Sequence, residues 1–246
     1  MFEAQTLLIA GCLFLGAILY TSVGHAGASA YIAVMTLFDL PPAVIKPTAL
    51  TLNIFVSSYT SLRYIKSKLF DKSLFLYLSL GSVPAAYIGG RINLPSNVYK
   101  PVIGLLLLLS GVRFLVQALQ SDRAHRELNK PLAVFIGACV CLRSGITGTG
   151  GGIFLSPLII FFAWTSVKGA SGTAALFILT NSVFGLLGHI SSVSELPDAL
   201  WLFAIAVIVG ALIGTRLGIK QFSNEMVKRA LGAVLIIAST KLIFNW

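Results

Sequence analysis

The chain has few charged residues for its length. Only 11% of its 246 residues are charged and 57% are hydrophobic, whereas a soluble domain carries about 25% charged residues. This composition excludes a soluble globular domain. Long apolar runs recur from end to end, and a transmembrane helix needs about 20 mostly apolar residues. We therefore expect an all-α integral membrane protein surrounded by lipid.

Carboxylates and cysteines are also scarce. No Asp or Glu stands in the middle of an apolar run, and Asp39 lies at the end of one. Carboxylates within the membrane are typical of ion pathways and proton relays. Their absence speaks against a metal-ion substrate, and we expect no metal site and no cofactor. Cys12, Cys139 and Cys141 all lie within apolar runs, which predicts buried thiols rather than a disulfide framework.

Basic residues are numerous and fall in the loops. Lys and Arg number 18 against 8 acidic residues, giving a net charge of +10. They cluster at 63–72, 113–130 and 216–229, whereas 191–198 holds two acids and no base. The positive-inside rule explains this pattern and places the basic loops in the cytoplasm. The charge therefore indicates membrane orientation and no nucleic-acid partner, and both termini are expected outside.

The apolar segments form two matching groups of five. They are expected at 5–23, 28–40, 43–62, 73–90 and 98–118, and at 131–147, 151–164, 168–190, 199–216 and 226–244. An offset of 124 superimposes Gly24 on Gly148, Gly27 on Gly151 and Ser58 on Ser182. Internal repeats are typical of secondary transporters. We predict an N-terminal repeat at 1–120, a basic cytoplasmic linker at 121–130 and a C-terminal repeat at 131–246.

Counting membrane crossings makes the two repeats inverted. The positions of the basic and acidic loops require an odd number of crossings in each half, so the halves face opposite ways. Segments 28–40 and 151–164 reach only about 20 Å, short of a hydrocarbon core of roughly 30 Å. We expect short broken or re-entrant helices that meet near mid-membrane. The alternative is ten full crossings in a locally thinned bilayer.

Each short segment begins with a glycine-rich turn. We call 24–29 (Gly-His-Ala-Gly-Ala-Ser) the first tip and 148–152 (Gly-Thr-Gly-Gly-Gly) the second tip. Small side chains expose backbone amides, and a helix start adds roughly half a positive charge, so the paired tips predict an anion site. The alternative is that the glycines only permit a tight turn. The candidate substrate-binding residues are Gly24, His25, Ala26, Gly27, Ala28, Ser29, Thr147, Gly148, Thr149, Gly150, Gly151 and Gly152.

Two basic side chains lie at or near the tips: His25 within the first tip, and Arg143 inside the apolar segment that precedes the second. His25 is either a buried, hydrogen-bonded histidine or a proton-sensitive contact to the ligand, because its charge changes near neutral pH. Arg143 is either a functional group within the membrane or a side chain that snorkels to the cytoplasmic surface.

Other residues are expected to support the bundle. Asn53 and Asn181 favour hydrogen bonds between helices, with lining of the site as the second interpretation. Arg91 and Arg216 correspond at an offset of 125 and are expected to anchor helix ends or attract anions. Small residues recur every four positions at Gly81, Ala85 and Gly89 and at Gly210, Gly214 and Gly218, which predicts close helix contacts.

The two five-segment halves, the first tip, and the second tip followed by Pro157 resemble the TauE/SafE sulfite exporter family. This family belongs to the toluene sulfonate uptake permease superfamily. The resemblance covers nearly the whole chain. It implies a multi-pass protein of the bacterial inner membrane that moves sulfur-containing anions such as sulfite, sulfonates or sulfoacetate.

We therefore predict export of sulfite or an organosulfonate by alternating access. An inside-negative potential drives anions outward by about 2.3 kcal/mol per charge per 100 mV, so export needs no coupling ion. The alternatives are an anion channel and a proton-coupled anion uptake permease. An intramembrane hydrolase using His25 or His189 is less favoured, because neither histidine stands in a recognisable serine motif. We expect no enzymatic activity, and the sequence leaves the oligomeric state open.

Overall fold

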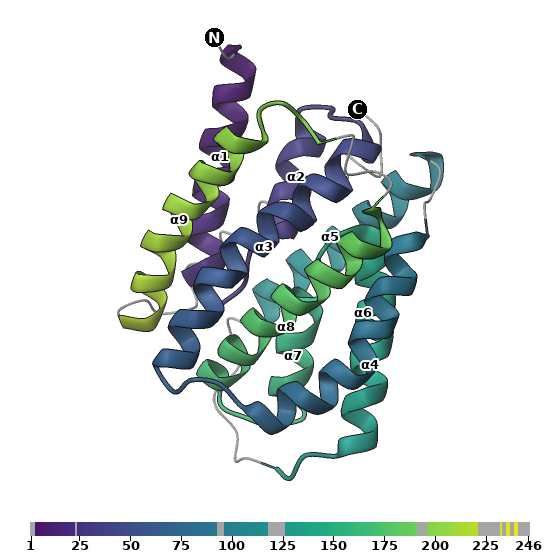
Figure 1. The fold of residues 1–246 in the computed structure, drawn as a ribbon, viewed down its shortest axis with the longest axis vertical. Coiled ribbons are helices and arrows are strands. Elements are labelled where there is room, and N and C mark those ends of the chain that lie inside the picture. The colour runs from purple at the N-terminus through teal and green to yellow at the C-terminus, as the bar shows by residue number, and fades with distance from the viewer. Residues whose placement is uncertain are drawn as a thin grey trace.

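The structure, a computed structural model, describes residues 3–22, 24–92, 96–117, 126–190 and 196–220, together with 232, 235, 236, 239 and 240. Segment 226–244 and the first half of the linker therefore fall mostly outside the described residues. The regular elements of the described part are all α-helices (Figure 1). They are α1 (Ala4–Ser22), α2 (Ala28–Leu37), α3 (Pro42–Lys66), α4 (Lys72–Arg91), α5 (Ser96–Gln117), α6 (Lys130–Thr147), α7 (Gly152–Phe161), α8 (Val167–Gly188) and α9 (Leu200–Lys220).

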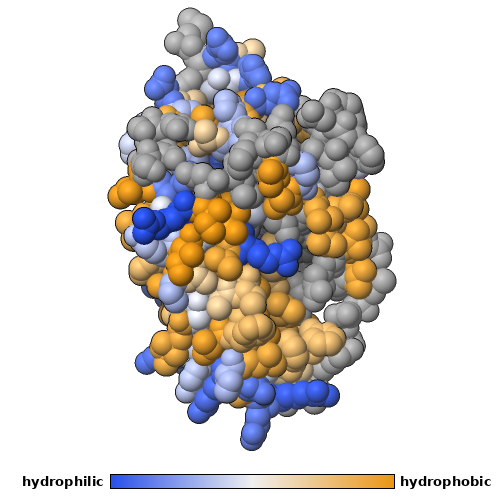
Figure 2. Space-filling view, turned by 90° about the vertical axis from the view of Figure 1, so that its right-hand side faces the viewer, coloured by the Kyte–Doolittle hydropathy of each residue, from blue (hydrophilic) through white to orange (hydrophobic). Residues whose placement is uncertain are grey.

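The helices have the length and surface of membrane spans. Among the described residues, α1, α4, α6, α8 and α9 each supply a window long and apolar enough to cross a bilayer. Large apolar side chains point outward from them, including Phe135 (65% exposed) and Trp201 (72% exposed). On the face shown in Figure 2, hydrophobic side chains predominate in the middle, with a few hydrophilic groups among them, and hydrophilic side chains gather at both ends. The prediction of an all-α membrane protein is confirmed.

The two short helices are shorter than their apolar segments. Both α2 and α7 have 10 residues, which corresponds to about 15 Å. Each ends where the backbone turns left-handed, at Asp39 (φ 57°) and Ala163 (φ 54°). A left-handed residue just beyond the last turn is a common way to end a helix. Neither helix is long enough to cross a bilayer alone.

Small residues bring pairs of helices into backbone contact. Gly81 and Gly89 of α4 lie against carbonyls of α6, so an added Cβ at either would clash with the Val134 or Leu142 oxygen. Gly210, Gly214 and Gly218 bring α9 equally close to α1. The contact surfaces predicted from the spacing of small residues are therefore confirmed, because the helix backbones meet at these residues.

The central helices are α3 and α8, which run side by side (Figure 1). α1 packs on α9, and α4 packs on α6 and on α8. The ends of α3 and α9 and the start of α6 lie toward the same end of the bundle (Figure 1). These ends adjoin the basic loops, as the positive-inside rule requires of one membrane face.

Candidate functional site

The two glycine-rich tips meet inside the bundle. The His25 Nε2 atom lies 3.1 Å from the carbonyl oxygen of Gly152, the first residue of α7. It also lies 3.1 Å from the Ser156 Oγ atom, one turn further along α7. All three residues are buried, and His25 is only 6% exposed. Residues more than 120 positions apart in the chain are therefore joined at the start of a short helix.

The backbone of both tips requires glycine. Gly24, Gly27, Gly148, Gly150 and Gly151 have φ between 72° and 112°, a left-handed region that residues with a Cβ rarely adopt. Gly27 and Gly151 are also the N-cap residues of α2 and α7, and neither makes a side-chain cap. The first amides of a helix have no partner within it. Both short helices therefore start with amides that no capping side chain satisfies.

The role of the His25 Nε2 atom depends on the tautomer of the ring. A carbonyl oxygen only accepts, so the contact to Gly152 requires a hydrogen on Nε2. This holds for one neutral tautomer and for the protonated ring. In the other neutral tautomer Nε2 accepts a hydrogen bond from the Ser156 hydroxyl group instead. The aromatic neighbour of the imidazole is Tyr20, whose ring meets it edge-on at 6.5 Å between centroids.

Asn53 and Ser182 form the polar wall of the second tip. The Asn53 Nδ2 atom of α3 donates to the Ser182 Oγ atom of α8 over 3.3 Å. An added Cβ at Gly150 would lie 2.5 Å from Asn53 Nδ2 and 3.0 Å from Ser182 Oγ. The Asn53 Oδ1 atom is buried and has no hydrogen-bond partner among the described residues. The interhelical hydrogen bond expected of Asn53 is confirmed, whereas Asn181 bonds the Phe177 carbonyl within α8.

Hydroxyl groups gather at the end of α6, where the second tip begins. Thr147 Oγ1 and Thr149 Oγ1 are 3.1 Å apart, and Thr149 also donates to Ser144 Oγ over 3.4 Å. All three side chains are buried. Of these, Ser144 was not among the predicted site residues, and neither were Ser156 and Ser182. A lone serine in an apolar segment has no pattern that reveals which distant residue it contacts.

Lys46 lies against the second tip, which the sequence did not lead us to expect. It lies near the start of α3, is 4% exposed, and its Cγ atom would lie 3.0 Å from a Cβ at Gly148. Its Nζ atom donates to the carbonyls of Gly90 (3.0 Å) and Ile92 (3.1 Å) at the end of α4. The signal was present, because a lysine within an apolar segment is a functional candidate by default.

The predicted arginines lie away from the tips. The guanidinium of Arg143 lies 6.0 Å from the Phe154 ring centroid and borders a largely apolar cavity of about 270 Å³ between α6 and α7. Phe154 and Leu158 line that cavity, whereas Gly152 and Ser156 face His25, so the cavity lies on the opposite side of α7. Cys139 lines the same cavity and is exposed, so the prediction that all three cysteines are buried is wrong.

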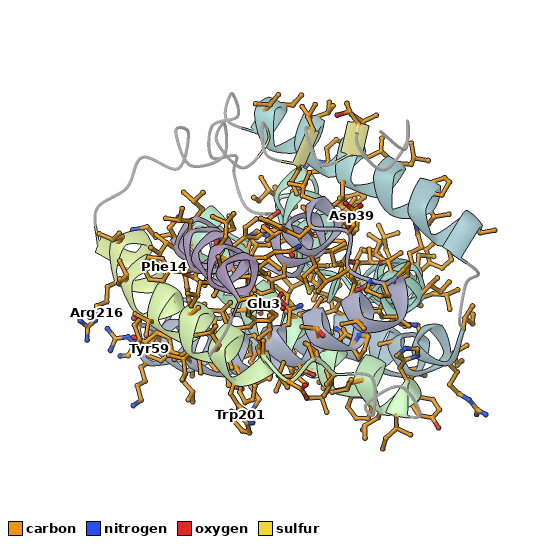
Figure 3. All side chains as sticks on the ribbon, turned by 90° about the horizontal axis from the view of Figure 1, so that it is seen from above. Glu3, Phe14, Asp39, Tyr59, Trp201 and Arg216 are labelled. Atoms are coloured by element: carbon orange, nitrogen blue, oxygen red, sulfur yellow. The ribbon has the colours of Figure 1, made fainter. Side chains whose placement is uncertain are left out.

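The remaining two arginines are at helix ends. The Arg91 guanidinium lies 6.0 Å from the Tyr87 ring centroid at the end of α4. Arg216, near the end of α9, is exposed and points away from the bundle (Figure 3). Neither is brought to the tips by the structure, and their roles as anchors or anion attractors stay predictions.

A polytopic helical bundle with two buried, glycine-rich helix starts is the architecture of a membrane transporter. The family model of the sulfite exporter TauE/SafE matches residues 8–242, and the chain belongs to this family. The resemblance seen in the tips is thereby confirmed.

Relatives of the chain are described as probable membrane transporters. The chain is 35% identical to the probable membrane transporter protein y4hK of Sinorhizobium fredii, over 98% of this chain and 100% of that one. It is 25% identical to the probable membrane transporter protein YunE of Bacillus subtilis, over 84% and 83% of the two chains. The probable membrane transporter protein YjnA of the same species is 25% identical over 94% and 96%. No solved structure matches the chain.

Proposed function

We propose that this transporter exports a small sulfur-containing oxyanion, sulfite or an organosulfonate, by alternating access. The observation that carries the proposal is the buried contact between His25 of the first tip and Gly152 at the start of α7. It brings the start of a second helix to the first tip, where α2 begins.

The electrostatics of this place favour an anion. Each helix start carries roughly half a positive charge, and amides without a partner point along the helix axis. Anions bind at such starts without any fully charged side chain. The donors within the tips and their wall are the amides of Gly150 and Gly151 and the hydroxyl groups of Ser182 and Thr149. Sulfite and sulfonate oxygens are acceptors that fit this set of donors.

Reciprocal packing supports the duplication from which the inverted repeat is inferred. If the repeats are 1–120 and 131–246, α1 corresponds to α6 and α4 to α9. The contact of α1 with α9 then has its counterpart in that of α6 with α4, and both are extensive. The left-handed residues agree, because Gly24, Gly27 and Asp39 correspond to Gly148, Gly151 and Ala163 at the one offset of 124.

Alternating access requires a central contact that can break, and the contact of His25 with α7 is the candidate. The His25 hydrogen bonds to Gly152 and Ser156 join the two halves across the centre. The sequence halves interlock through α1 with α9 and α4 with α6, so the rocking units are the α1–α2–α9 bundle and the α4–α6–α7–α8 bundle. Rocking of one bundle against the other breaks the His25 hydrogen bonds and exposes the tips to one side of the membrane at a time. With an inside-negative potential, the anion leaves the cytoplasm without a coupling ion. The proposal places the chain in the bacterial inner membrane with both termini outside.

The His25–Ser156 pair also raises a second candidate function, an intramembrane hydrolase. A serine activated by histidine needs an imidazole nitrogen free to accept its proton. In the tautomer that donates from Nε2 to the Gly152 carbonyl, this nitrogen cannot accept the serine proton. An anion channel or a proton-coupled uptake permease would use the same tips, and flux measurements separate them from an exporter.

The test is transport by the purified protein in proteoliposomes. Labelled sulfite, sulfate and methanesulfonate are loaded, and efflux is followed with and without a pH gradient. The proposal predicts saturable sulfite or sulfonate flux with counterflow and no requirement for a pH gradient. Steady, non-saturating conductance would identify a channel instead, and an absolute requirement for the gradient would identify a proton-coupled permease.

A further inference from the structure

Lys46 is a buried cation without an acidic partner among the described residues. Its side chain is 4% exposed, and its two hydrogen bonds go to the carbonyls of Gly90 and Ile92. These carbonyls end α4, where the helix dipole favours a positive charge. An ammonium group has three donors, so two carbonyls leave one donor for a further acceptor. Burying a charge is costly unless it is paired, and two neutral carbonyls pair it only in part.

Lys46 connects the end of α4 with the second tip. Its aliphatic stem lies against Gly148, where an added Cβ would be 3.0 Å from Cγ. Its ammonium group, at the far end of the side chain, lies at the Gly90 carbonyl. The buried His189 imidazole hydrogen-bonds the same Gly90 backbone and lies near Lys46. Two basic side chains therefore lie beside the second tip: Lys46 at Gly148 and His25 at Gly152.

The first tip has no equivalent of this lysine. At the offset of 124, Lys46 corresponds to Ala170. Gly24, the equivalent of Gly148, lies against the neighbouring residue Ser171 at the start of α8. The two tips therefore share their backbone form but differ in charge. A feature required only for packing of a tip would appear at both, so the lysine points to a task specific to the second tip.

We propose that Lys46 is the specificity-determining cation of the anion site. Its ammonium group exchanges between the α4 carbonyls and an oxygen of the anion bound at the second tip. The proposal rests on the proposed transport of small oxyanions and names the residue that recognises their charge. Because Coulomb attraction grows with the charge of the ligand, Lys46 favours sulfite, which carries up to two negative charges, over methanesulfonate, which carries one.

The experiment compares Michaelis constants for these two anions in proteoliposomes. Lys46→Gln keeps a donor for the α4 carbonyls and removes the charge, and Lys46→Arg keeps the charge. Lys66→Met is the control, because Lys66 is an exposed lysine at the other end of the same helix. We expect Lys46→Gln to raise the sulfite KM by about tenfold, the factor for losing one charge-assisted hydrogen bond, and the methanesulfonate KM by less. Lys46→Arg and Lys66→Met should keep the wild-type ratio of the two constants.

The ratio of the two constants decides the outcome. A purely structural lysine changes folding yield or maximal rate for both anions alike, so an unchanged ratio in Lys46→Gln overturns the proposal while leaving anion transport intact. A wild-type protein that carries neither anion overturns the proposed function itself. A variant that inserts poorly still reports the ratio, because KM does not depend on the amount of active protein.

Discussion

Replacing Gly150 with alanine tests the second tip with the smallest side chain available. The residue has φ +72°, and its added Cβ would lie 2.5 Å from Asn53 Nδ2 and 3.0 Å from Ser182 Oγ. The left-handed conformation costs about 1–2 kcal/mol for a residue with a Cβ. Crowding a packed site costs about 1–3 kcal/mol. The two costs together give a strain of roughly 2–5 kcal/mol. The strain is relieved when the tip moves away from the Asn53–Ser182 pair.

The assay is sulfite efflux from proteoliposomes, with thermal unfolding in detergent as the measure of fold. Since about 1.4 kcal/mol is a factor of ten in rate, Gly150→Ala should lower the flux by at least about tenfold while the protein still inserts. Gly11→Ala is the matched control, because Gly11 lies in the middle of α1 with nothing within 4 Å of an added Cβ. It should keep full flux. Wild-type flux in Gly150→Ala would refute the tip as the site of recognition.

Four further substitutions test the other contacts of the bundle. His25→Ala removes the hydrogen bonds from the first tip to α7 and should slow transport by at least about tenfold. Ser156→Ala leaves the Gly152 contact and should stay within about fivefold, since one neutral hydrogen bond contributes about 1 kcal/mol. Equal, complete loss in both would instead favour the hydrolase, which an ester-cleavage assay checks. Gly89→Leu places a side chain into the Leu142 carbonyl of α6 and should abolish accumulation of folded protein, measured by size-exclusion chromatography against Gly11→Leu. Arg143→Leu alters the cavity on the far side of α7 and should leave the sulfite KM within about threefold of wild type; a large rise in KM would place Arg143 in the site.

The helix starts and their contact surfaces were predictable from the sequence. Gly27 and Gly151 begin α2 and α7 as expected, because glycines before an apolar run signal a backbone that other residues do not adopt. The glycines of α4 and α9 marked the contacts with α6 and α1 for the same local reason. Small residues repeated at a helical spacing form a groove that a neighbouring helix backbone can enter.

The partners of single polar residues were not predictable. Ser156 contacts a histidine 131 positions away, and nothing in its local sequence distinguishes it from other serines. Arg143 faces the apolar cavity and Ser144 faces the tip, although they are neighbours, because adjacent helix positions point about 100° apart. Periodicity gives the apolar face of a helix, but in a membrane protein both faces are apolar, so it does not give the inward side.

Selenite binding tests the central claim most directly, because selenite has the shape and charge of sulfite and a heavy atom that anomalous X-ray scattering locates. Crystals of the protein soaked in selenite should show one strong anomalous peak within hydrogen-bond distance of the second-tip amides, beside Gly150 and His25. The same peak should disappear in Gly150→Ala. A peak found only at surface lysines, in a protein that transports sulfite, would contradict the proposed anion site.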